Sequence, residues 1–595
     1  MRVSTLHETE IDGVRCFWVD AQRPTLTARL IFRQGMADEV LSESGWLHLL
    51  EHLCLHGRGG GVLDVNGSVS ILETQFDAHG PSGVTAQHLR EVCAWLAKPD
   101  FGELDRERGV LRAEARLRHS ASARALNWRY GAQGPGLVAY DEPGLAVDTP
   151  EFLAERAARV FTVDNAVLAL NGPPPVGLQL PLGRGEFLPP RPAAPCEDDL
   201  GMYVEEAGLV MSGVVERSHA ATWVPEIVQR ALKQRLRDEL GAAYSPFATY
   251  ERVDSSHAVI VAGSDVLPDI LPHLAGRVLD LVGTMTSEAV PAQWIDEMRA
   301  ARLQALADPD TAGSQAWRAA YGVLVGDPPE DLAELVERTR SVDGDEIRHE
   351  LTRFCDSLLL GLPGGSAWSD QLPTLRFPTS PQAASGAAFR SADWPANRSV
   401  LHIAADRIAV SDQDRVLEAR IPELAGMYRF PDGGRHLVRR DGWTLQIEPK
   451  RWQSSGVITD ALDATVPSHL HLPQPVRDAP MSRRTPWIVR WWTYLSSRSV
   501  LWPIAIVSLL MVIIYGVAIA IDQLPENVLG MSASAVQGGL LLAGVIAFLI
   551  ARKLRTHAVK TDESDTGRTV ALVNNPGPDA EAAQTSSTES GVAPH

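Results

Sequence analysis

The sequence predicts an α+β fold divided among several domains. Short alternating apolar runs such as 14–20 are typical of strands, whereas proline-free stretches such as 45–56 and 103–119 are typical of helices. The two kinds of element are mixed, with few strand–helix–strand repeats, which favours α+β over a doubly wound parallel sheet. Segments rich in proline and small residues interrupt the pattern at 172–195 and 363–395. A chain of 595 residues therefore holds three or four domains.

These breaks give a definite domain plan. In chain order it consists of an α+β unit at 1–171, a Pro-rich linker at 172–195, a second α+β unit at 196–362, a linker at 363–395, a small β-rich domain at 396–475, two apolar spans at 500–521 and 535–551, and a polar tail at 561–595 that we expect to be disordered. The β-rich domain is predicted from short β runs with the hairpin signals Asp432-Gly-Gly and Asp441-Gly. Its pattern resembles a pleckstrin-homology fold; interaction, membrane-surface docking and a spacer role all fit it.

Two apolar segments near the end predict a membrane anchor. Residues 500–521 carry no charge and are long enough to cross a bilayer as a helix, and 535–551 is a shorter second span. Basic residues flank the pair on both outer sides, while the loop between them has neither Lys nor Arg. The positive-inside rule then places both ends of the chain in the cytoplasm. The alternative for either segment is a buried hairpin.

The first unit contains the pattern His48-x-x-Glu51-His52 in an apolar, proline-free run. Residues four apart share one face of a helix, so both imidazoles can bind one Zn²⁺. Glu51 lies beside them, where a carboxylate can take a proton from metal-bound water. This is the inverted order of the H-E-x-x-H motif. The alternative is a surface helix with two solvated histidines.

A third ligand is expected downstream, because a catalytic zinc takes three protein ligands and keeps one open position. The charged helical stretch at 105–118 contains Glu107 and Glu114, which are seven residues apart and point the same way. A solvated charged face is the alternative for such a run. His56 follows the motif but precedes a glycine run, which favours a solvated residue at the helix end.

The order of these features resembles the pitrilysin (insulinase-like) metallopeptidase family. The resemblance covers the G-x-x-x-E turn from Gly35 to Glu39, the inverted motif, the E-x(6)-E pair and the segment beginning Tyr140-Asp-Glu-Pro-Gly. It implies that His48, His52 and Glu114 bind zinc, that Glu107 supports the site from outside the ligand shell, and that Glu51 is the general base. The resemblance also places residues 76–80 on the edge strand that pairs with substrate.

In the second unit, the segment from Arg237 to Tyr244 resembles the family's R-x-x-x-G-x-x-Y. The resemblance implies that both side chains contact the substrate backbone, where a cation and a phenol can donate to a developing oxyanion. The alternative is a glycine-capped helix followed by a strand, with Arg237 solvated and Tyr244 half buried. The gap between His52 and Glu114 is shorter than the family's, which is expected to alter the wall of the cleft and the choice of substrate.

Composition narrows the function further. A formal net charge of −19 argues against a nucleic-acid partner. The five cysteines are few, odd in number and without metal-type spacing, which favours reduced thiols in the cytosol. The first residues lack the apolar core of a signal peptide, so none is expected.

Taken together, these features predict a membrane-anchored zinc endopeptidase whose catalytic domains face the cytoplasm and whose substrates are peptides. Family peptidases enclose a chamber with four such units, and this chain has two. A homodimer is therefore expected, with a heterodimer with a related subunit as the alternative. The rival function is a non-catalytic binding or assembly subunit of the same fold at the membrane.

Overall fold

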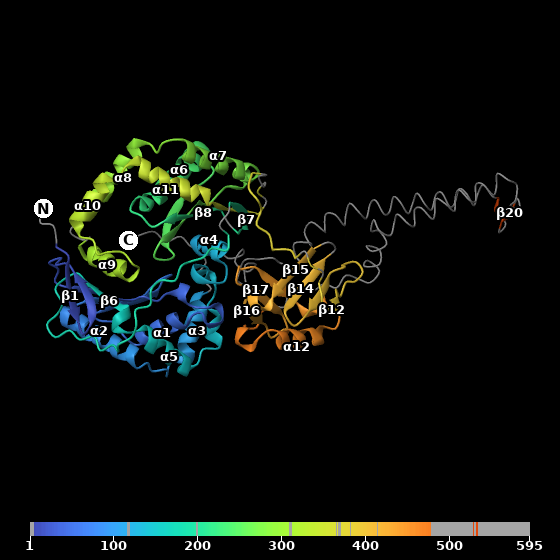
Figure 1. Ribbon diagram of the computed structural model, residues 1–595, viewed down its shortest axis with the longest axis horizontal. Coiled ribbons are helices and arrows are strands. Elements are labelled where there is room, and N and C mark those ends of the chain that lie inside the picture. Colours follow the sequence, from blue (N-terminus) through green and yellow to red (C-terminus); the bar gives the residue numbers. More distant parts are fainter. Residues whose placement is uncertain are drawn as a thin grey trace.

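A computed structural model describes residues 5–477 and two short pairs, 527–528 and 531–532. The gaps within the main range are 116–119, 198–199, 207, 309–311, 365, 367–370, 381, 383 and 413–414. The protein has a mixed α and β structure with two sheet-based units and a third, β-rich domain (Figure 1).

The first unit is built on a six-stranded sheet in the order β1-β2-β6-β3-β5-β4. The strands are β1 (His7–Ile11), β2 (Val14–Trp18), β3 (Leu26–Phe32), β4 (Asp64–Val69), β5 (Thr74–Gly80) and β6 (Ala166–Leu170). Only β2 and β6 run parallel; the other neighbours are antiparallel. One face packs in a shared core with α1 (Trp46–Leu55), α2 (Ser82–Ala97), α3 (Leu104–Ala115) and α5 (Pro150–Val160). Alternate residues of β2, β3 and β6 supply most of the strand side chains in this core, as period-two patterning predicts.

The second unit repeats this plan. Its strands are β7 (Gly201–Glu205), β8 (Leu209–Glu216), β9 (Phe247–Arg252), β10 (His257–Ser264) and β11 (Leu359–Pro363). The order β7-β11-β8-β10-β9 has the same strand directions as β2-β6-β3-β5-β4 in the first sheet. The helices are α6 (Val224–Leu232), extended by the π-helical η7 (Lys233–Glu239), then α7 (Leu274–Ser287), α8 (Ala292–Ala307), α10 (Leu332–Ser341) and α11 (Gly344–Asp356). Helix α6 thus takes the place in the second unit that α1 takes in the first.

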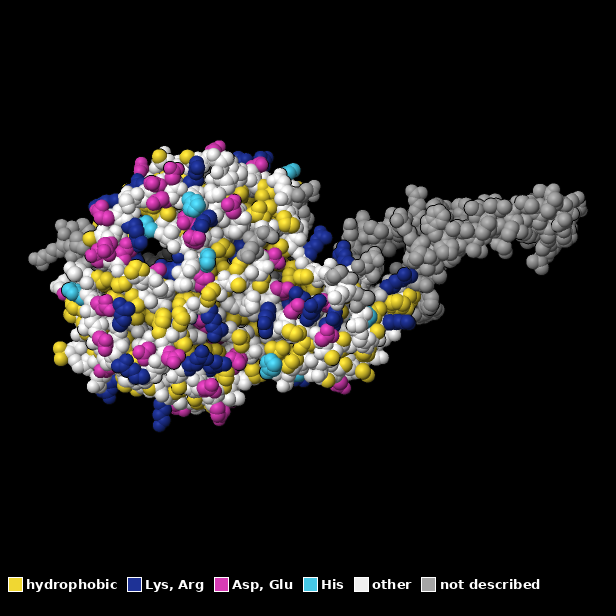
Figure 2. Space-filling model, in the orientation of Figure 1, with side chains coloured by type: hydrophobic (Ala, Val, Ile, Leu, Met, Phe, Trp, Pro, Cys, Tyr) yellow, Lys and Arg dark blue, Asp and Glu magenta, His cyan; other side chains and the backbone are white. Residues whose placement is uncertain are grey.

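The two units exchange one helix each. Helix α9 (Ala312–Leu324) belongs to the second unit in sequence but covers the other face of the first sheet. Helix α4 (Ala121–Tyr130) belongs to the first unit but packs on the second sheet. Polar contacts also join each exchanged helix to the sheet that it covers. Trp317 of α9 donates to Gln75 over 2.8 Å, and Arg124 of α4 pairs with Glu205 over 2.6 Å. Figure 2 shows that the molecule is hollowed where the helices of the second unit face the first unit.

The β-rich domain has two four-stranded sheets and one helix around its own core. The sheets are β12-β13-β14-β15 and β18-β17-β16-β19, and the helix is α12 (Ser455–Thr465). The strands are β12 (Ala387–Arg390), β13 (Val400–Ile403), β14 (Arg407–Asp412), β15 (Arg415–Arg420), β16 (Leu424–Arg429), β17 (Arg435–Arg439), β18 (Thr444–Ile447) and β19 (His471–Pro473). The two predicted glycine turns join β16 to β17 and β17 to β18. The first strand, β12, lies within the stretch that its composition assigned to a linker.

The predicted membrane spans at 500–521 and 535–551 and the tail at 561–595 lie outside the described residues. Within the range that is described, no helix is both long enough and apolar enough to cross a bilayer. Two short strands near the end, β20 (Asn527–Val528) and β21 (Met531–Ser532), pair antiparallel.

Candidate metal centre

Helix α1 carries the histidine motif and is anchored at its N-terminus by a buried glutamate. Its N-cap is Gly45, whose φ of 99° lies in the left-handed region that favours glycine. With no side chain at the cap, Glu39 satisfies the first donors: its carboxylate accepts from Gly45 N over 2.9 Å and from Leu47 N over 3.1 Å. Burial raises the pKa of Glu39 well above its usual value, and the two backbone donors oppose that shift. The G-x-x-x-E turn from Gly35 to Glu39 therefore supplies the carboxylate that caps the N-terminus of α1.

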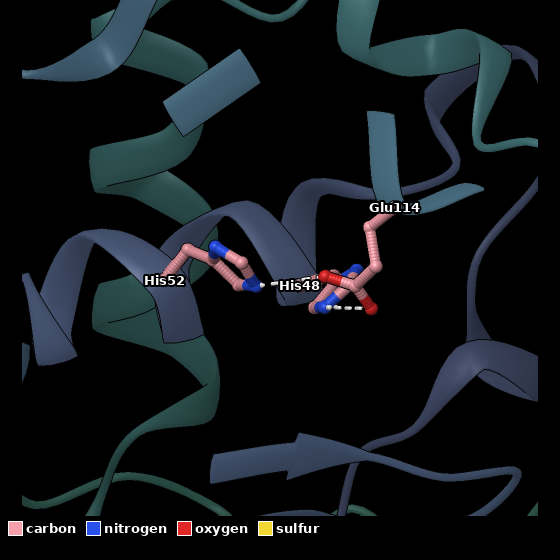
Figure 3. Close-up of side chains that lie close together, drawn as sticks. All are labelled: His48, His52 and Glu114. Carbon is pink, nitrogen blue, oxygen red and sulfur yellow. Dashed lines mark ion pairs between the residues drawn. The ribbon is translucent and has the colours of Figure 1, made fainter. Parts of the chain in front are cut away.

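The structure brings His48, His52 and Glu114 together. Their ligand atoms all lie within 4.8 Å of one another. His48 Nε2 lies 3.8 Å from Glu114 Oε1, and His52 Nε2 lies 3.4 Å from Glu114 Oε2 (Figure 3). The histidines come from α1 and the glutamate from α3, so the site depends on how these two helices pack.

This donor set fits a zinc ion. Ligands roughly 2.0–2.2 Å from zinc in a tetrahedral arrangement lie about 3.3–3.6 Å from one another, close to the spacing seen here. The imidazole orientation also fits, because both Nδ1 atoms face other carboxylates and both Nε2 atoms face Glu114. Burial, and next the nearby His48, lower the pKa of His52, which favours the neutral form that binds a metal.

Two carboxylates hold the far nitrogens of the histidines. Glu107 Oε2 lies 3.3 Å from His52 Nδ1, where the sequence predicted a supporting residue. The other oxygen of Glu107 lies 2.8 Å from His56 Nδ1, so His56 contacts the centre from outside instead of being a purely solvated end residue. Sequence reasoning missed the second carboxylate, Glu142, whose Oε1 lies 3.0 Å from His48 Nδ1. Such contacts fix the tautomer and orientation of ligand histidines.

Glu51 lies beside the three ligands and is almost fully buried. Its Oε2 is 3.8 Å from Nε2 of both histidines. Burial raises the pKa of Glu51 to about 7, and the neighbouring carboxylates of Glu114 and Glu142 add to the shift while His48 opposes it. A pKa near neutrality suits a group that accepts and later returns a proton.

The strand beside Glu51 is β4, which forms the edge of the first sheet. The sequence placed residues 76–80 on the edge strand, and this prediction is wrong. Those residues lie in β5, which pairs with β3 on one side and β4 on the other. The true edge strand, 64–69, follows a glycine run and is largely exposed. Its composition resembles that of a loop, so the short alternation of polar and apolar residues did not identify it as a strand.

Gly67 of β4 allows this edge to pass directly against the candidate base. A Cβ placed there would overlap Glu51 Oε1 and would lie 2.6 Å from Cδ and 2.8 Å from Cγ of the same side chain. We therefore expect Gly67→Ala to move Glu51 out of place and to reduce strongly the peptide hydrolysis that the sequence predicts, while zinc binding persists. Steady-state kinetics and zinc titration of Gly67→Ala, with the exposed Ser68→Ala as control, check this. Unchanged kinetics in Gly67→Ala would contradict it.

Arg237 and Tyr244 lie together on the second unit. The Arg237 guanidinium carbon is 5.3 Å from the centre of the Tyr244 ring, and its Nη1 donates to Tyr244 O over 3.3 Å. Tyr244 is 73% exposed. Arg237 is likewise exposed. The pair therefore lies on the surface of the second unit.

Comparison with known proteins establishes the fold. No family model and no curated protein matches the sequence. Among solved structures, a protease from Helicobacter pylori is similar at 12% identity, with 61% of this chain and 100% of that chain covered and a TM-score of 0.52. The peptidase M16 inactive domain from Pseudomonas fluorescens matches at 14% identity, 61% and 100% coverage and a TM-score of 0.50.

The likeness to pitrilysin is weaker and adds nothing to the assignment: 13% identity, 60% of this chain, 45% of that chain, TM-score 0.48. At such identities the comparison shows the fold alone, and one of the two better matches is an inactive domain. Whether this chain has peptidase chemistry therefore depends on its own side chains. The chain has the fold of M16 peptidases.

Proposed function

We propose that this protein is a zinc-dependent endopeptidase. The observation that carries the proposal is the convergence of His48, His52 and Glu114 within 4.8 Å, with the buried carboxylate of Glu51 3.8 Å from both imidazoles. A non-catalytic protein of the same fold would have no need to keep three metal ligands and a general base close together.

Bound zinc supplies Lewis-acid chemistry, lowering the pKa of water and polarising a carbonyl. The residues of the chain do the rest. Glu51 takes a proton from the attacking water, whose oxygen bonds to the scissile carbonyl carbon, and returns the proton to the departing amine as the C–N bond breaks. Glu107 and Glu142 keep the two imidazoles oriented throughout.

An extended peptide is the substrate class that fits this site. Among the strands that the structure describes, β4 pairs with β5 alone, so its free side, next to Glu51, can add one peptide strand to the sheet. The Arg237–Tyr244 pair is exposed, so in a dimer it could serve the site of a second chain. A homodimer needs only this sequence; a related subunit is the alternative.

We also propose that the two apolar segments, 500–521 and 535–551, anchor the enzyme in the cell membrane with its catalytic units on the cytoplasmic side. The support is the sequence alone: the uncharged length of the first segment and the basic residues on both outer flanks. The substrates would then be cytosolic or membrane-proximal peptides.

Hydrolysis of a quenched fluorescent peptide library by the full-length detergent-solubilised protein tests the function. We expect cleavage by the purified protein, loss of cleavage after chelation, and recovery on adding one equivalent of zinc. Zinc binding without cleavage of any peptide would instead support the rival function, a non-catalytic subunit. Failure to bind zinc would contradict the proposed chemistry.

A further inference from the structure

The β-rich domain packs directly on the part of the first unit that surrounds the metal centre. Eight apolar side chains form this interface, which we call the docking cluster, and none is more than 7% exposed. Leu41, Ala132, Leu137 and Tyr140 come from the first unit, and Tyr428, Phe430, Val438 and Leu472 come from the β-rich domain. Such thorough burial of large apolar side chains indicates a fixed contact.

Backbone contacts tighten this interface. Ala132 N donates to Arg440 O over 2.9 Å, at the turn that follows β17. A Cβ at Gly131 would overlap Arg440 O and lie 2.5 Å from the carbonyl carbon of Asp441, so only glycine permits this approach. In addition, β19 contacts the 3-10 helix η4 (Pro143–Ala146), and β16 contacts η2 (Leu41–Glu43). The β-rich domain therefore covers segment 131–146 along its length.

The opposite side of this segment rests on the start of α1. A Cβ at Gly45 would lie 2.6 Å from Glu142 Cβ and 2.8 Å from Leu145 Cγ. Gly144 is equally close to the backbone of Glu43 and Ser44. Segment 131–146 is thus held between the helix that carries His48 and the β-rich domain.

Glu142 lies at this point, and its backbone is strained. It is the N-cap of η4 with φ 51° and ψ 56°, a left-handed conformation that is unfavourable for a residue other than glycine. Strained residues of this kind persist where the surrounding structure holds them. The side chain is 6% exposed and places Oε1 3.0 Å from His48 Nδ1.

We propose that the β-rich domain braces the metal centre: by packing on segment 131–146 it positions Glu142 against His48, so that zinc affinity depends on a domain that supplies no ligand. This inference rests on the proposed zinc chemistry. It gives the β-rich domain a role in the site, in place of a spacer between the catalytic units and the membrane.

The test compares zinc dissociation constants, measured on full-length protein by competition with a chromogenic chelator. Leu472→Ala opens the docking cluster, while Leu462→Ala opens the core of the same domain in α12; both side chains are fully buried. We expect Leu472→Ala to weaken zinc binding by up to the roughly 10–100-fold that loss of an outer-shell partner costs. Leu462→Ala should leave it unchanged. Equal affinities in the two variants would overturn the brace.

A double variant distinguishes an effect on the position of Glu142 from a general destabilisation of the protein. Glu142→Gln alone should weaken zinc binding, and adding Leu472→Ala should weaken it no further, because the brace acts through the Glu142 carboxylate. Additive effects would overturn the proposal.

If Leu472→Ala does not fold, judged by its thermal unfolding, Val438→Ala opens the same cluster with a smaller cavity. Wild-type protein that binds no zinc would refute the metal centre itself. Tight zinc binding that is unchanged by variants of the docking cluster would refute only the bracing role of the β-rich domain.

Discussion

Glu51→Gln is expected to abolish detectable peptide hydrolysis while leaving zinc binding intact. The amide has the shape of the carboxylate but cannot accept the proton of the attacking water, so the general base is lost without opening a cavity. Removal of general base catalysis typically costs about 10²–10⁴-fold in rate, and the effect should fall on kcat. Because Glu51 is buried and its pKa is raised to about 7, the neutral amide should also fit its environment without destabilising the fold.

The measurement is single-turnover cleavage of a selected peptide by wild-type and Glu51→Gln protein, each with its zinc content determined. Glu103→Gln is the matched control, since Glu103 precedes α3 and its side chain is 51% exposed. A Glu51→Gln protein that cleaves at the wild-type rate would show that another group takes the proton and would contradict the assigned mechanism.

Glu114→Ala is expected to weaken zinc binding by more than the roughly 10–100-fold that loss of an outer-shell residue costs, because it removes a direct ligand. The carboxylate lies within 3.4 Å of His52 Nε2 and 3.8 Å of His48 Nε2, so the two imidazoles alone would remain. Glu114→Gln, which keeps one oxygen donor without its charge, should fall between Glu114→Ala and wild type.

Competition with a chelator measures these affinities, and Glu151→Ala, an exposed change at the start of α5, serves as control. Hydrolysis at saturating zinc should recover in part in Glu114→Gln. Wild-type zinc affinity in Glu114→Ala would remove this residue from the ligand set and leave Glu51 or Glu107 as the third donor.

Spacing along single helices made the core of this site predictable. The four-residue interval in α1 and the seven-residue interval in α3 each place side chains on one helix face, and the structure shows these faces opposed. Helix ends followed capping rules: α1 ends at Leu55, before the glycine run, and α5 begins after Thr149, whose hydroxyl accepts from Phe152 N.

Contacts between distant segments were not predictable in this way. Glu142 reaches His48 across 94 residues of sequence, from a backbone conformation that no local pattern signals. Helices α4 and α9 have ordinary helical patterns, and nothing in a pattern says which sheet a helix covers, so their exchange between the units emerges only in three dimensions. Strand β4 was hidden by its polar, glycine-containing composition, which edge strands tolerate.

Zinc K-edge X-ray absorption of freshly purified full-length protein identifies the atoms that bind the metal. We expect close to one zinc per chain, bound by two imidazoles and by oxygen donors at about 2.0–2.2 Å, without a sulfur shell at about 2.3 Å. The imidazole signal should fall in His52→Ala. The proposed metal centre would be contradicted by a sulfur shell or by a site without imidazole. Protein that neither contains nor takes up zinc would contradict it as well.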